Sequence, residues 1–372
     1  MSELYSQHNN HQEDYHMKST FVALAMIGAM LLSLGGSDYA VAQLLSVPVD
    51  TPPAIDGVAE GVWNAAAEVV IPVAGGANTS STQVSVRSVN TKDMIYFLLQ
   101  WTDPTGSVVR FPWKKQADGT WKQLVGPENK GEDETTYYED KLAMIWNIND
   151  SIASFNQIGC MATCHVGEAG KPFGNKYTAK SGERGDIWHW KGVRTNPVGQ
   201  VDDQYVDDTR YDAKTAPEAG RKSDPATGGG YKDNVNAAKD GPAFTSPTQP
   251  GTYWILDEQK TPFVDTYNKG DEIAGIIVAK RLGDRGDISG KGVYANSKWT
   301  LEIGRLKNTG SEFDVQFTDP LKKYYFGVAT FDNAQVRHSW QAGVTALSFV
   351  TTPTGIEPQG KLATTWGRMK IK

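Results

Sequence analysis

Met94-Ile95-Tyr96-Phe97-Leu98-Leu99-Gln100-Trp101 is the stretch of sequence that decides the fold. It is apolar at almost every position, so neither side of a strand built from it can face water, and Thr102-Asp103-Pro104 ends the run. A short, continuous apolar run bounded by turn residues is typical of a strand in the middle of a sheet. We therefore expect residues 94–101 to form a central strand that is covered on both sides.

Other short apolar runs, separated by turn signals, follow along the chain. They lie at residues 69–73, 84–89, 140–146, 253–256, 273–279, 299–303, 325–331 and 346–350. The run at 299–303 alternates with period two, which indicates one packed and one solvated side. The 372 residues also include 38 glycines, 11 tryptophans and 15 tyrosines. Together these features predict an all-β fold, an antiparallel β-sandwich with long loops and a few short helices.

The chain's two cysteines occur together in Cys160-Met161-Ala162-Thr163-Cys164-His165. Two thiols can form thioether bonds to the two vinyl groups of a haem, and a histidine directly after the second thiol can supply an axial nitrogen to the iron. The usual attachment sequence has two residues between the cysteines, whereas this one has three. The extra residue lengthens the loop without changing its chemistry. The motif therefore predicts one covalently attached haem c, held by Cys160 and Cys164, with His165 as an iron ligand.

A six-coordinate haem needs a second axial ligand. Beyond residue 42 the sequence contains three histidines, His165, His189 and His338. His338 follows an apolar strand and begins a turn, a position from which a rigid strand can hold a ligand in place. His189 lies between two tryptophans. Spacing alone leaves His189 and His338 as equal candidates.

Other side chains near these motifs are weaker candidates for the cofactor site. Met144 and Met161 could also ligate iron, although a methionine in an apolar run is more often part of a core. Lys191 is a further, less favoured ligand. Trp188 and Trp190 are candidate cofactor contacts at the haem edge.

The first 42 residues read as an N-terminal extension and a signal peptide. Met17-Lys18 precedes an apolar run at 21–34, and Ala40-Val41-Ala42 is typical of a cleavage site. The run is too short for a mature membrane span, although an uncleaved anchor is the alternative. Loss of residues 1–42 removes four acids and one base and changes the formal charge from −6 to −3. We expect a periplasmic protein without a membrane span in its mature chain and without a nucleic-acid partner.

Residues 43–372 are expected to form a single haem-binding domain. A tract rich in Gly, Pro, Asp and Lys runs from about 167 to 251 and contains one aromatic island, Ile187-Trp188-His189-Trp190-Lys191. Long structureless loops inside compact domains are uncommon and are usually functional. We therefore interpret this tract as a long loop insertion that wraps the haem or meets a partner.

The chain resembles the haem-binding γ subunits of the type II dimethyl sulfoxide reductase group, which includes ethylbenzene dehydrogenase, selenate reductase and nitrite oxidoreductase. The resemblance extends over most of residues 43–372. It is carried by Ile55-Asp56-Gly57 with Trp63, the strand end at Leu98 to Asp103, Ile187 to Lys191, Trp299 to Arg305, and Phe326 to His338. The opening pattern also resembles family 9 carbohydrate-binding modules, which share the sandwich.

The resemblance implies a sandwich with one haem near a sheet end, exchanging electrons with an iron–sulfur subunit. In several members the haem is b-type and is held by a methionine and a lysine. The family methionine falls near the Cys160–His165 motif, and the family lysine falls on or next to His338. The resemblance therefore favours His338 over His189, and two imidazoles predict a lower potential than His/Met ligation.

These observations predict an exported, monohaem electron-transfer protein without substrate chemistry of its own. Its expected partners are the iron–sulfur and molybdopterin subunits of an oxidoreductase complex, or a soluble redox partner. One alternative is a copper-binding protein, because two thiolates and a histidine suit Cu(I). Another is a carbohydrate-binding sandwich in which Cys160 and Cys164 form a disulfide.

Overall fold

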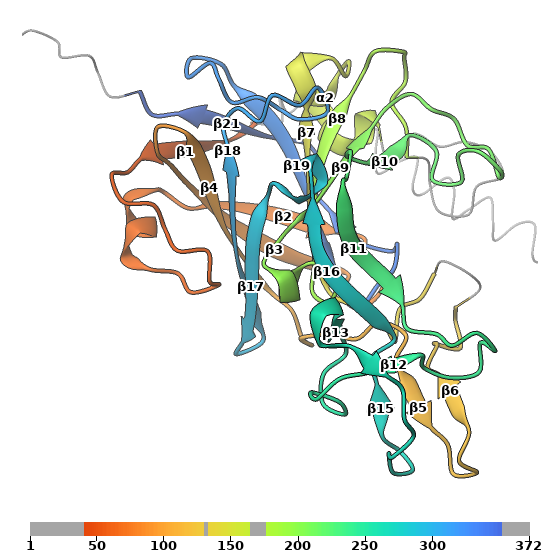
Figure 1. The fold of residues 1–372 in the computed structure, drawn as a ribbon. Helices are drawn as coiled ribbons and strands as arrows, with labels where there is room; N and C mark the ends of the chain where they lie inside the picture. Colours follow the sequence, from red (N-terminus) through yellow and green to blue (C-terminus); the bar gives the residue numbers. More distant parts are fainter. Residues whose placement is uncertain (1–40, 130–132, 164–175, 352–372) are drawn as a thin grey trace, which may run out of the picture. The chain divides into compact units, whose positions relative to one another are not determined.

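The computed structural model describes residues 41–129, 133–163 and 176–351, and its largest feature is a sheet of 13 strands (Figure 1). In chain order these strands are β1 (Ala42–Pro48), β2 (Val69–Ala74), β3 (Ser81–Asn90), β4 (Met94–Thr102), β7 (Lys141–Asn147), β8 (Gly185–Lys191), β9 (Asp202–Val206), β10 (Arg221–Ser223), β17 (Ser289–Ala295), β18 (Lys298–Leu306), β19 (Tyr324–Phe331), β20 (Ser339–Trp340) and β21 (Thr345–Phe349). They follow the order β10-β9-β8-β7-β19-β20-β2-β3-β4-β18-β17, and β1 adds parallel contacts to β21 and β3. The all-β, mainly antiparallel prediction is confirmed.

The two halves of this sheet face each other across a shared core. Trp146, Trp188 and Trp190 from one half belong to the same core cluster as Phe97 and Trp101 from the other. The ring centroids of Phe97 and Trp188 lie 5.6 Å apart, and those of Trp101 and Trp190 lie 6.0 Å apart, both edge to face. Such edge-to-face contacts are a favoured packing of large aromatic rings. The sheet thus forms the two packed layers of the predicted sandwich.

Strand β4 is buried on both sides, as its continuous apolar sequence predicts. Phe97 and Leu99 face the sandwich core. Tyr96 and Leu98, which point the opposite way, pack with Trp63 in a second cluster. In the sheet, β4 lies between β3 and β18. The prediction of a central strand covered on both sides is confirmed.

One buried carboxylate attaches the N-terminal segment to β18. Glu302 has no exposed surface. Its Oε2 accepts hydrogen bonds from the backbone N–H groups of Asp56 at 3.0 Å and Gly57 at 2.8 Å, and its Oε1 accepts one from Trp63 Nε1 at 2.8 Å. Trp63 lies on the 3₁₀ helix η1 (Gly61–Ala65). The segment with the Ile-Asp-Gly…Trp pattern therefore covers the side of β4 that faces away from the sandwich core. The carboxylate of Glu302 holds this segment in place.

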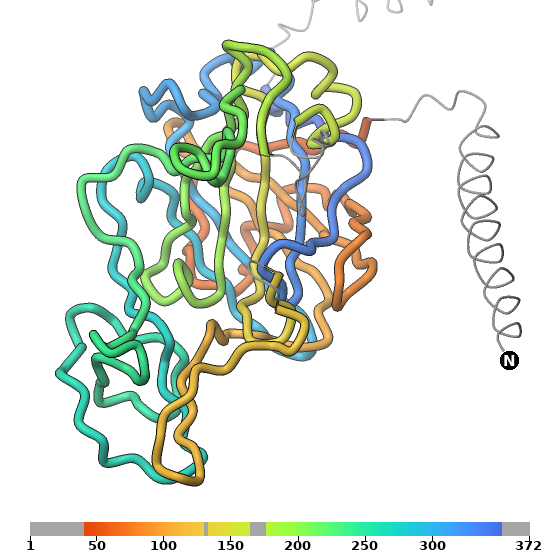
Figure 2. The backbone as a smooth tube through the Cα atoms, turned by 90° about the vertical axis from the view of Figure 1, so that its right-hand side faces the viewer, coloured from red at the N-terminus to blue at the C-terminus, as the bar shows by residue number. Residues whose placement is uncertain are grey.

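Three smaller sheets accompany the sandwich, and helices are few and short. The smaller sheets contain β5 (Trp113–Lys115), β6 (Trp121–Gln123) and β15 (Glu272–Ile273); β11 (Gly228–Asp233), β13 (Ile255–Leu256) and β16 (Ile276–Leu282); and β12 (Phe244–Thr245) with β14 (Thr261–Pro262). Figure 2 shows the orange segment of β5 and β6 beside the teal segment of β15 at one end of the domain.

The described helices are α2 (Phe155–Ile158) and the 3₁₀ helices η1, η2 (Ile148–Asp150), η3 (Gly159–Ala162), η4 (Asn196–Val198), η5 (Asp257–Gln259) and η6 (Asp284–Gly286). Within residues 41–129, 133–163 and 176–351, no helix is long and apolar enough to cross a membrane.

The tract expected to be a long loop insertion carries strands β8 to β12 in its described part, residues 176–251. All seven residues of β8 are buried, including Asp186 and Lys191. On β9, Asp202 is also fully buried and pairs with Lys191. The polar composition suggested a loop because charged residues usually lie in water. Here they pair with one another inside the fold, so polarity does not mark exposure.

Candidate functional site

The side chains of β7, β8 and β19 alternate between the sandwich core and the opposite face of these strands, which we call the outer face. Neighbouring strands are in register: Ala143 is paired with His189 and with Ala329, and Ile145 is paired with Gly327. The outer face includes Lys141, Ala143, Ile145, Ile187, His189, Lys191, Gly327, Ala329 and Phe331. Three of these nine positions are alanine or glycine. The centre of the face is therefore low and apolar, and the two lysines lie at one end of it, beside Phe331.

Gly327 lies directly beside the predicted attachment cysteine. A Cβ atom placed at Gly327 would lie 3.6 Å from Ile145 Cγ2 and 3.7 Å from the backbone nitrogen of Cys160, which are ordinary contact distances. Ala143 and Ala329 are half-buried. The outer face therefore presents an apolar floor whose edge is formed by the segment that carries Cys160.

Cys160 lies on η3 and is held firmly against this face. Its side chain is buried with Ile145 and Val344 in one cluster, and its Sγ lies 4.0 Å from the carbonyl oxygen of Gln341. Gly159 precedes it with a φ of 59°, and a Cβ there would lie only 2.1 Å from the carbonyl oxygen of Gly343. A side chain at position 159 would thus move the segment, so this glycine fixes where Cys160 sits. Cys164 and His165 lie outside the described residues.

His189 is a buried imidazole on the outer face with one nitrogen available. Its Nδ1 hydrogen-bonds to Gln204 Oε1 at 3.2 Å, whereas its Nε2 has no hydrogen-bond partner among the residues that the structure describes. Burial lowers the pKa of His189 well below its usual range, and the nearby Lys191 and Lys141 ammonium groups lower it further. A neutral imidazole whose Nδ1 is fixed and whose Nε2 is unoccupied is the form that ligates metals.

His338 lies next to the same face. It is half-buried, directly precedes β20, and its Nδ1 donates a hydrogen bond to the carbonyl oxygen of Val336 at 2.7 Å. The ring of Phe331 lies between the two candidate histidines, with ring centroids 5.4 Å from His189 and 4.6 Å from His338. The structure therefore brings both candidate distal ligands to one place at the border of the outer face.

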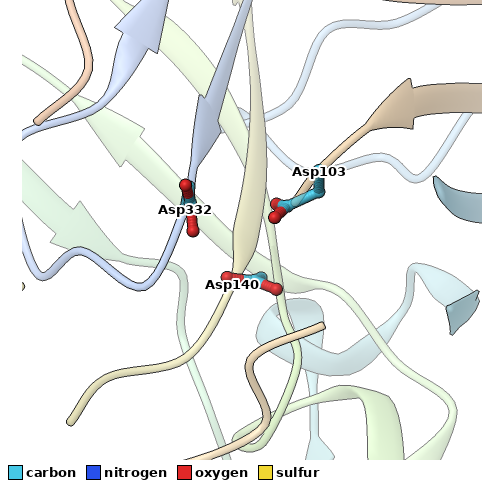
Figure 3. Close-up of side chains that lie close together, drawn as sticks. All are labelled: Asp103, Asp140 and Asp332. Carbon is cyan, nitrogen blue, oxygen red and sulfur yellow. The ribbon is translucent and has the colours of Figure 1, made fainter. Parts of the chain in front are cut away.

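Three aspartates converge from separate segments where the chain leaves β19 toward His338 (Figure 3). Asp140 Oδ1 accepts the backbone N–H of Asn333 at 2.8 Å. The two oxygens of Asp332 accept hydrogen bonds from the hydroxyls of Thr79 and Thr105, at 2.6 and 3.2 Å. Asp140 and Asp332 therefore position the start of the turn that carries His338. The third residue, Asp103, lies next to this pair and accepts the backbone N–H of Thr105.

Asp103 is a buried carboxylate in an unfavourable setting. Burial and, to a lesser extent, the neighbouring carboxylate of Asp332 together raise the pKa of Asp103 to about 7, against a backbone hydrogen bond from Thr105 that lowers it. The cluster is therefore sensitive to pH in the neutral range, although it lies outside the outer face.

A family model for ethylbenzene dehydrogenase matches residues 53–343 of this sequence. The chain belongs to the ethylbenzene dehydrogenase family. Membership connects it with an oxidoreductase-related family and confirms, at the level of the family, the resemblance seen in the sequence. The match spans β2 to β20 and so contains the outer face, His189 and His338.

Solved structures with a similar fold include a family 9 carbohydrate-binding module from Caldicellulosiruptor kristjanssonii in complex with glucose. It is 10% identical, with a TM-score of 0.32, over 85% of this chain and 98% of that one. A putative carbohydrate-binding protein from Bacteroides uniformis is 9% identical, with a TM-score of 0.30, over 84% of this chain and 100% of that one. A search of curated proteins found no match.

Several residues of this family member that the sequence suggested for the cofactor lie elsewhere. Trp188, Trp190 and Met144 point into the sandwich core and have no exposed surface. Because side chains alternate along a strand, they lie on the side of the sheet opposite His189, so their assignment as cofactor contacts or ligands is corrected. Lys191, by contrast, lies on the same face as His189, and its ammonium is paired with Asp202. Met161, beside Cys160, is 39% exposed.

The small residues of the outer face were not among the predicted site residues. Their signal was present in the family member's sequence: Ala143 alternates with Leu142 and Met144, and Gly327 and Ala329 flank Val328. In a sandwich, small residues at every second position of two adjacent strands indicate a surface that something flat can cover. We had assigned these runs only as apolar strands.

Proposed function

We propose that this chain is an exported, monohaem c-type cytochrome that transfers electrons as the γ subunit, or as a partner, of a molybdenum oxidoreductase of the dimethyl sulfoxide reductase type. Family membership supports an association with such an oxidoreductase. The attachment motif supports covalent haem, and the signal-like residues 1–42 support export to the periplasm. The iron–sulfur and molybdopterin subunits, or a soluble redox protein, are the proposed partners.

The observation that carries the proposal is the composition of the outer face. A haem c site requires thiols at its edge, an apolar floor and nitrogen ligands. Ala143, Gly327 and Ala329 form such a floor, Cys160 lies at its edge, and the unpartnered Nε2 of His189 lies beside it among the described residues. The residues present therefore fit the group.

In this proposal each residue has a separate role. Cys160 and Cys164 would hold the haem through two thioether bonds, and His165 would supply one nitrogen ligand to the iron. His338 would supply the second, and its hydrogen bond to Val336 orients the ring. His189 is the alternative, with Gln204 orienting it. When bound, the haem exchanges one electron between ferric and ferrous iron.

The surroundings keep the candidate nitrogens in the form that binds a metal. The lowered pKa of His189 leaves its imidazole neutral at pH 7. Phe331 packs against both rings and restricts their rotation. Fixed ligands of this kind are what an electron carrier needs, because little has to rearrange when the iron changes oxidation state.

An absorption spectrum tests the proposal. The protein is matured with a cytochrome c assembly system, and oxidised and dithionite-reduced spectra are recorded for wild type, His338→Ala and His189→Ala. Extraction with acidified acetone tests whether the haem is covalently bound. We expect non-extractable, low-spin haem in the wild type and a change to high spin in His338→Ala, with His189→Ala unchanged.

Each other result has a definite meaning. A high-spin change in His189→Ala alone would assign the second ligand to His189. If both single variants stay low-spin, the test moves to Met161→Leu. Wild-type protein without haem would refute the cytochrome proposal. Copper titration and a glycan pull-down would then distinguish the copper-binding and carbohydrate-binding alternatives.

A further inference from the structure

A second group of carboxylates lies at β8 and β9, on the side of these strands opposite the outer face. Asp186 on β8 and Asp203 on β9 meet Asp314, which comes from the segment between β18 and β19. One oxygen from each lies within 4.8 Å of the others. Asp224, directly after β10, donates its backbone N–H to the carbonyl oxygen of Asp203 at 3.2 Å. All four side chains are at most 2% exposed.

The charge of this group is not balanced by the described residues around it. Arg305, itself fully buried, donates to Asp186 Oδ2 at 2.7 Å and lies 3.8 Å from Asp314 Oδ2. Four carboxylates and one guanidinium leave three negative charges inside the fold. Buried charge without a counter-charge is strongly unfavourable. The group therefore needs either protons or a cation.

Few donors reach the oxygens of this group; among them are Arg305 and the Val315 N–H, which donate to Asp186 Oδ2. Other close neighbours are carboxyls: Asp224 lies beside Asp314, and Asp203 lies beside Asp287. Among the described residues, six buried carboxylate oxygens lack a hydrogen-bond partner: Asp186 Oδ1, both oxygens of Asp203, both oxygens of Asp224, and Asp314 Oδ1. The cluster of Asp103, Asp140 and Asp332 is different, because hydroxyl, indole and backbone donors satisfy it. Buried polar atoms in native proteins nearly always have a partner, so a missing proton or cation is implied at Asp186, Asp203, Asp224 and Asp314 and not at the cluster of Asp103, Asp140 and Asp332.

We propose that Asp186, Asp203, Asp224 and Asp314 form a Ca²⁺ site. The donor set consists of oxygens, which suits a hard cation rather than copper or zinc. Calcium takes six to eight oxygens at about 2.3–2.6 Å, so opposite ligands are about 4.8 Å apart. One oxygen from each of Asp186, Asp203 and Asp314 lies within 4.8 Å of the others, which agrees with that shell, and Asp224 contributes further unpartnered oxygens. Magnesium would require a tighter octahedron at about 2.0–2.1 Å, and it usually keeps several waters.

A cation here would join four segments that are far apart in the sequence. β8 and β9 supply Asp186 and Asp203, the end of β10 is followed by Asp224, and the segment after β18 supplies Asp314. Without the cation, burial together with the nearby Asp186 and Asp314 carboxyls raises the pKa of Asp224 to about 9. The metal-free cluster would then hold protons, which is the competing state that the experiment must exclude.

The test uses the mature, haem-loaded protein. Metal content is measured by plasma mass spectrometry after dialysis into metal-free buffer. Protein treated with a chelator is then titrated with CaCl₂ by calorimetry, with MgCl₂ in parallel, and thermal unfolding is followed with and without CaCl₂. Asp203→Asn and Asp224→Asn remove two proposed ligands. Asp332→Asn is the matched control, because it changes an aspartate of the hydrogen-bonded cluster.

We expect one calcium per chain and a midpoint of thermal unfolding that rises by about 5 °C in saturating CaCl₂. Asp203→Asn and Asp224→Asn should weaken calcium binding at least about tenfold, whereas Asp332→Asn should change it less than about twofold. The proposal is overturned if the wild type neither retains nor binds calcium. A greater stability of Asp203→Asn or Asp224→Asn than of wild type would then identify a protonated cluster. An equal response to MgCl₂ would overturn the assignment to calcium. If a variant fails to fold, the wild-type measurements still decide.

Discussion

Replacing Glu302 with glutamine should loosen the N-terminal segment from the sandwich and leave the outer face intact. Glu302 accepts two backbone hydrogen bonds at Oε2, from Asp56 and Gly57, and one indole hydrogen bond at Oε1, from Trp63. A glutamine side chain has the same shape but one acceptor oxygen and one NH₂ group. In one orientation the NH₂ faces two N–H donors, and in the other it faces the indole N–H.

The magnitude follows from the number of lost acceptors. Hydrogen bonds to a charged partner contribute about 1.5–3 kcal/mol each, and the substitution removes at least one of the three. Burial raises the pKa of Glu302, so removing the buried charge offsets part of this loss. We therefore expect the free energy of unfolding to fall by about 1–3 kcal/mol, which is within the usual range for the loss of a buried hydrogen bond.

Urea unfolding followed by tryptophan fluorescence measures this change, and hydrogen exchange shows whether residues 50–66 open first. Glu68→Gln is the matched control, because Glu68 is 39% exposed and lies 3.5 Å from Arg87. An exposed pair of this kind contributes about 0–1 kcal/mol. If Glu302→Gln were no less stable than Glu68→Gln, the reasoning about the buried anchor would be wrong.

Three further changes test other parts of the structure. Gly159→Ala should displace the attachment segment, reduce the haem incorporated during assembly and lower the free energy of unfolding by about 1–3 kcal/mol. The control is Gly310→Ala, because Gly310 has a φ of 79° and open space around it. This control should lower the free energy of unfolding by about 1 kcal/mol and leave the haem content, measured by the pyridine haemochrome assay, unchanged. The raised pKa of Asp103, about 7, means that the folded state holds a proton which the unfolded state releases near pH 4. Stability should therefore fall by about 1–3 kcal/mol as pH rises from about 4 to about 7, and Asp103→Asn should flatten that slope in urea titrations. Asp202→Asn leaves the buried cations Lys191 and Arg281 without their carboxylate and should lower the free energy of unfolding by about 3–5 kcal/mol. The control Asp233→Asn, at an exposed carboxylate, should lower it by less than about 1 kcal/mol. Equal effects of the two substitutions would contradict the buried-pair argument.

The strands that follow apolar patterns could be predicted from the sequence, and those that follow buried charges could not. Residues 94–101 and 325–331 carry enough apolar side chains to identify their strands without any tertiary information. In β9, Asp202 and Asp203 are both buried, but their sequence is that of a loop. Their burial depends on Lys191, Arg281 and Arg305, which come from other strands, and no local pattern contains that information.

The candidate site shows the same division. The attachment motif could be predicted because its residues are nearly consecutive in the sequence, and His338 was favoured because of the family resemblance. The apolar floor was missed because Ala143 and Ala329 are 186 residues apart and become neighbours only through the pairing of β7 with β19. Trp188 and Trp190 were misassigned because an aromatic island gives no indication of which side of a strand faces the core.

The pairing of β8 with β9 separates two kinds of chemistry on one pair of strands. His189 and Gln204 point to the outer face, and Asp186 and Asp203, each an odd number of residues away on its own strand, point to the opposite side. A neutral nitrogen ligand needs a surrounding that disfavours protons, which the cations near His189 provide. Carboxylates that bind a cation need the reverse, a local excess of negative charge. The sheet lets both environments exist within one strand pair, so that substitutions at Asp203 and at His189 can be tested separately, each with the other site as its internal control.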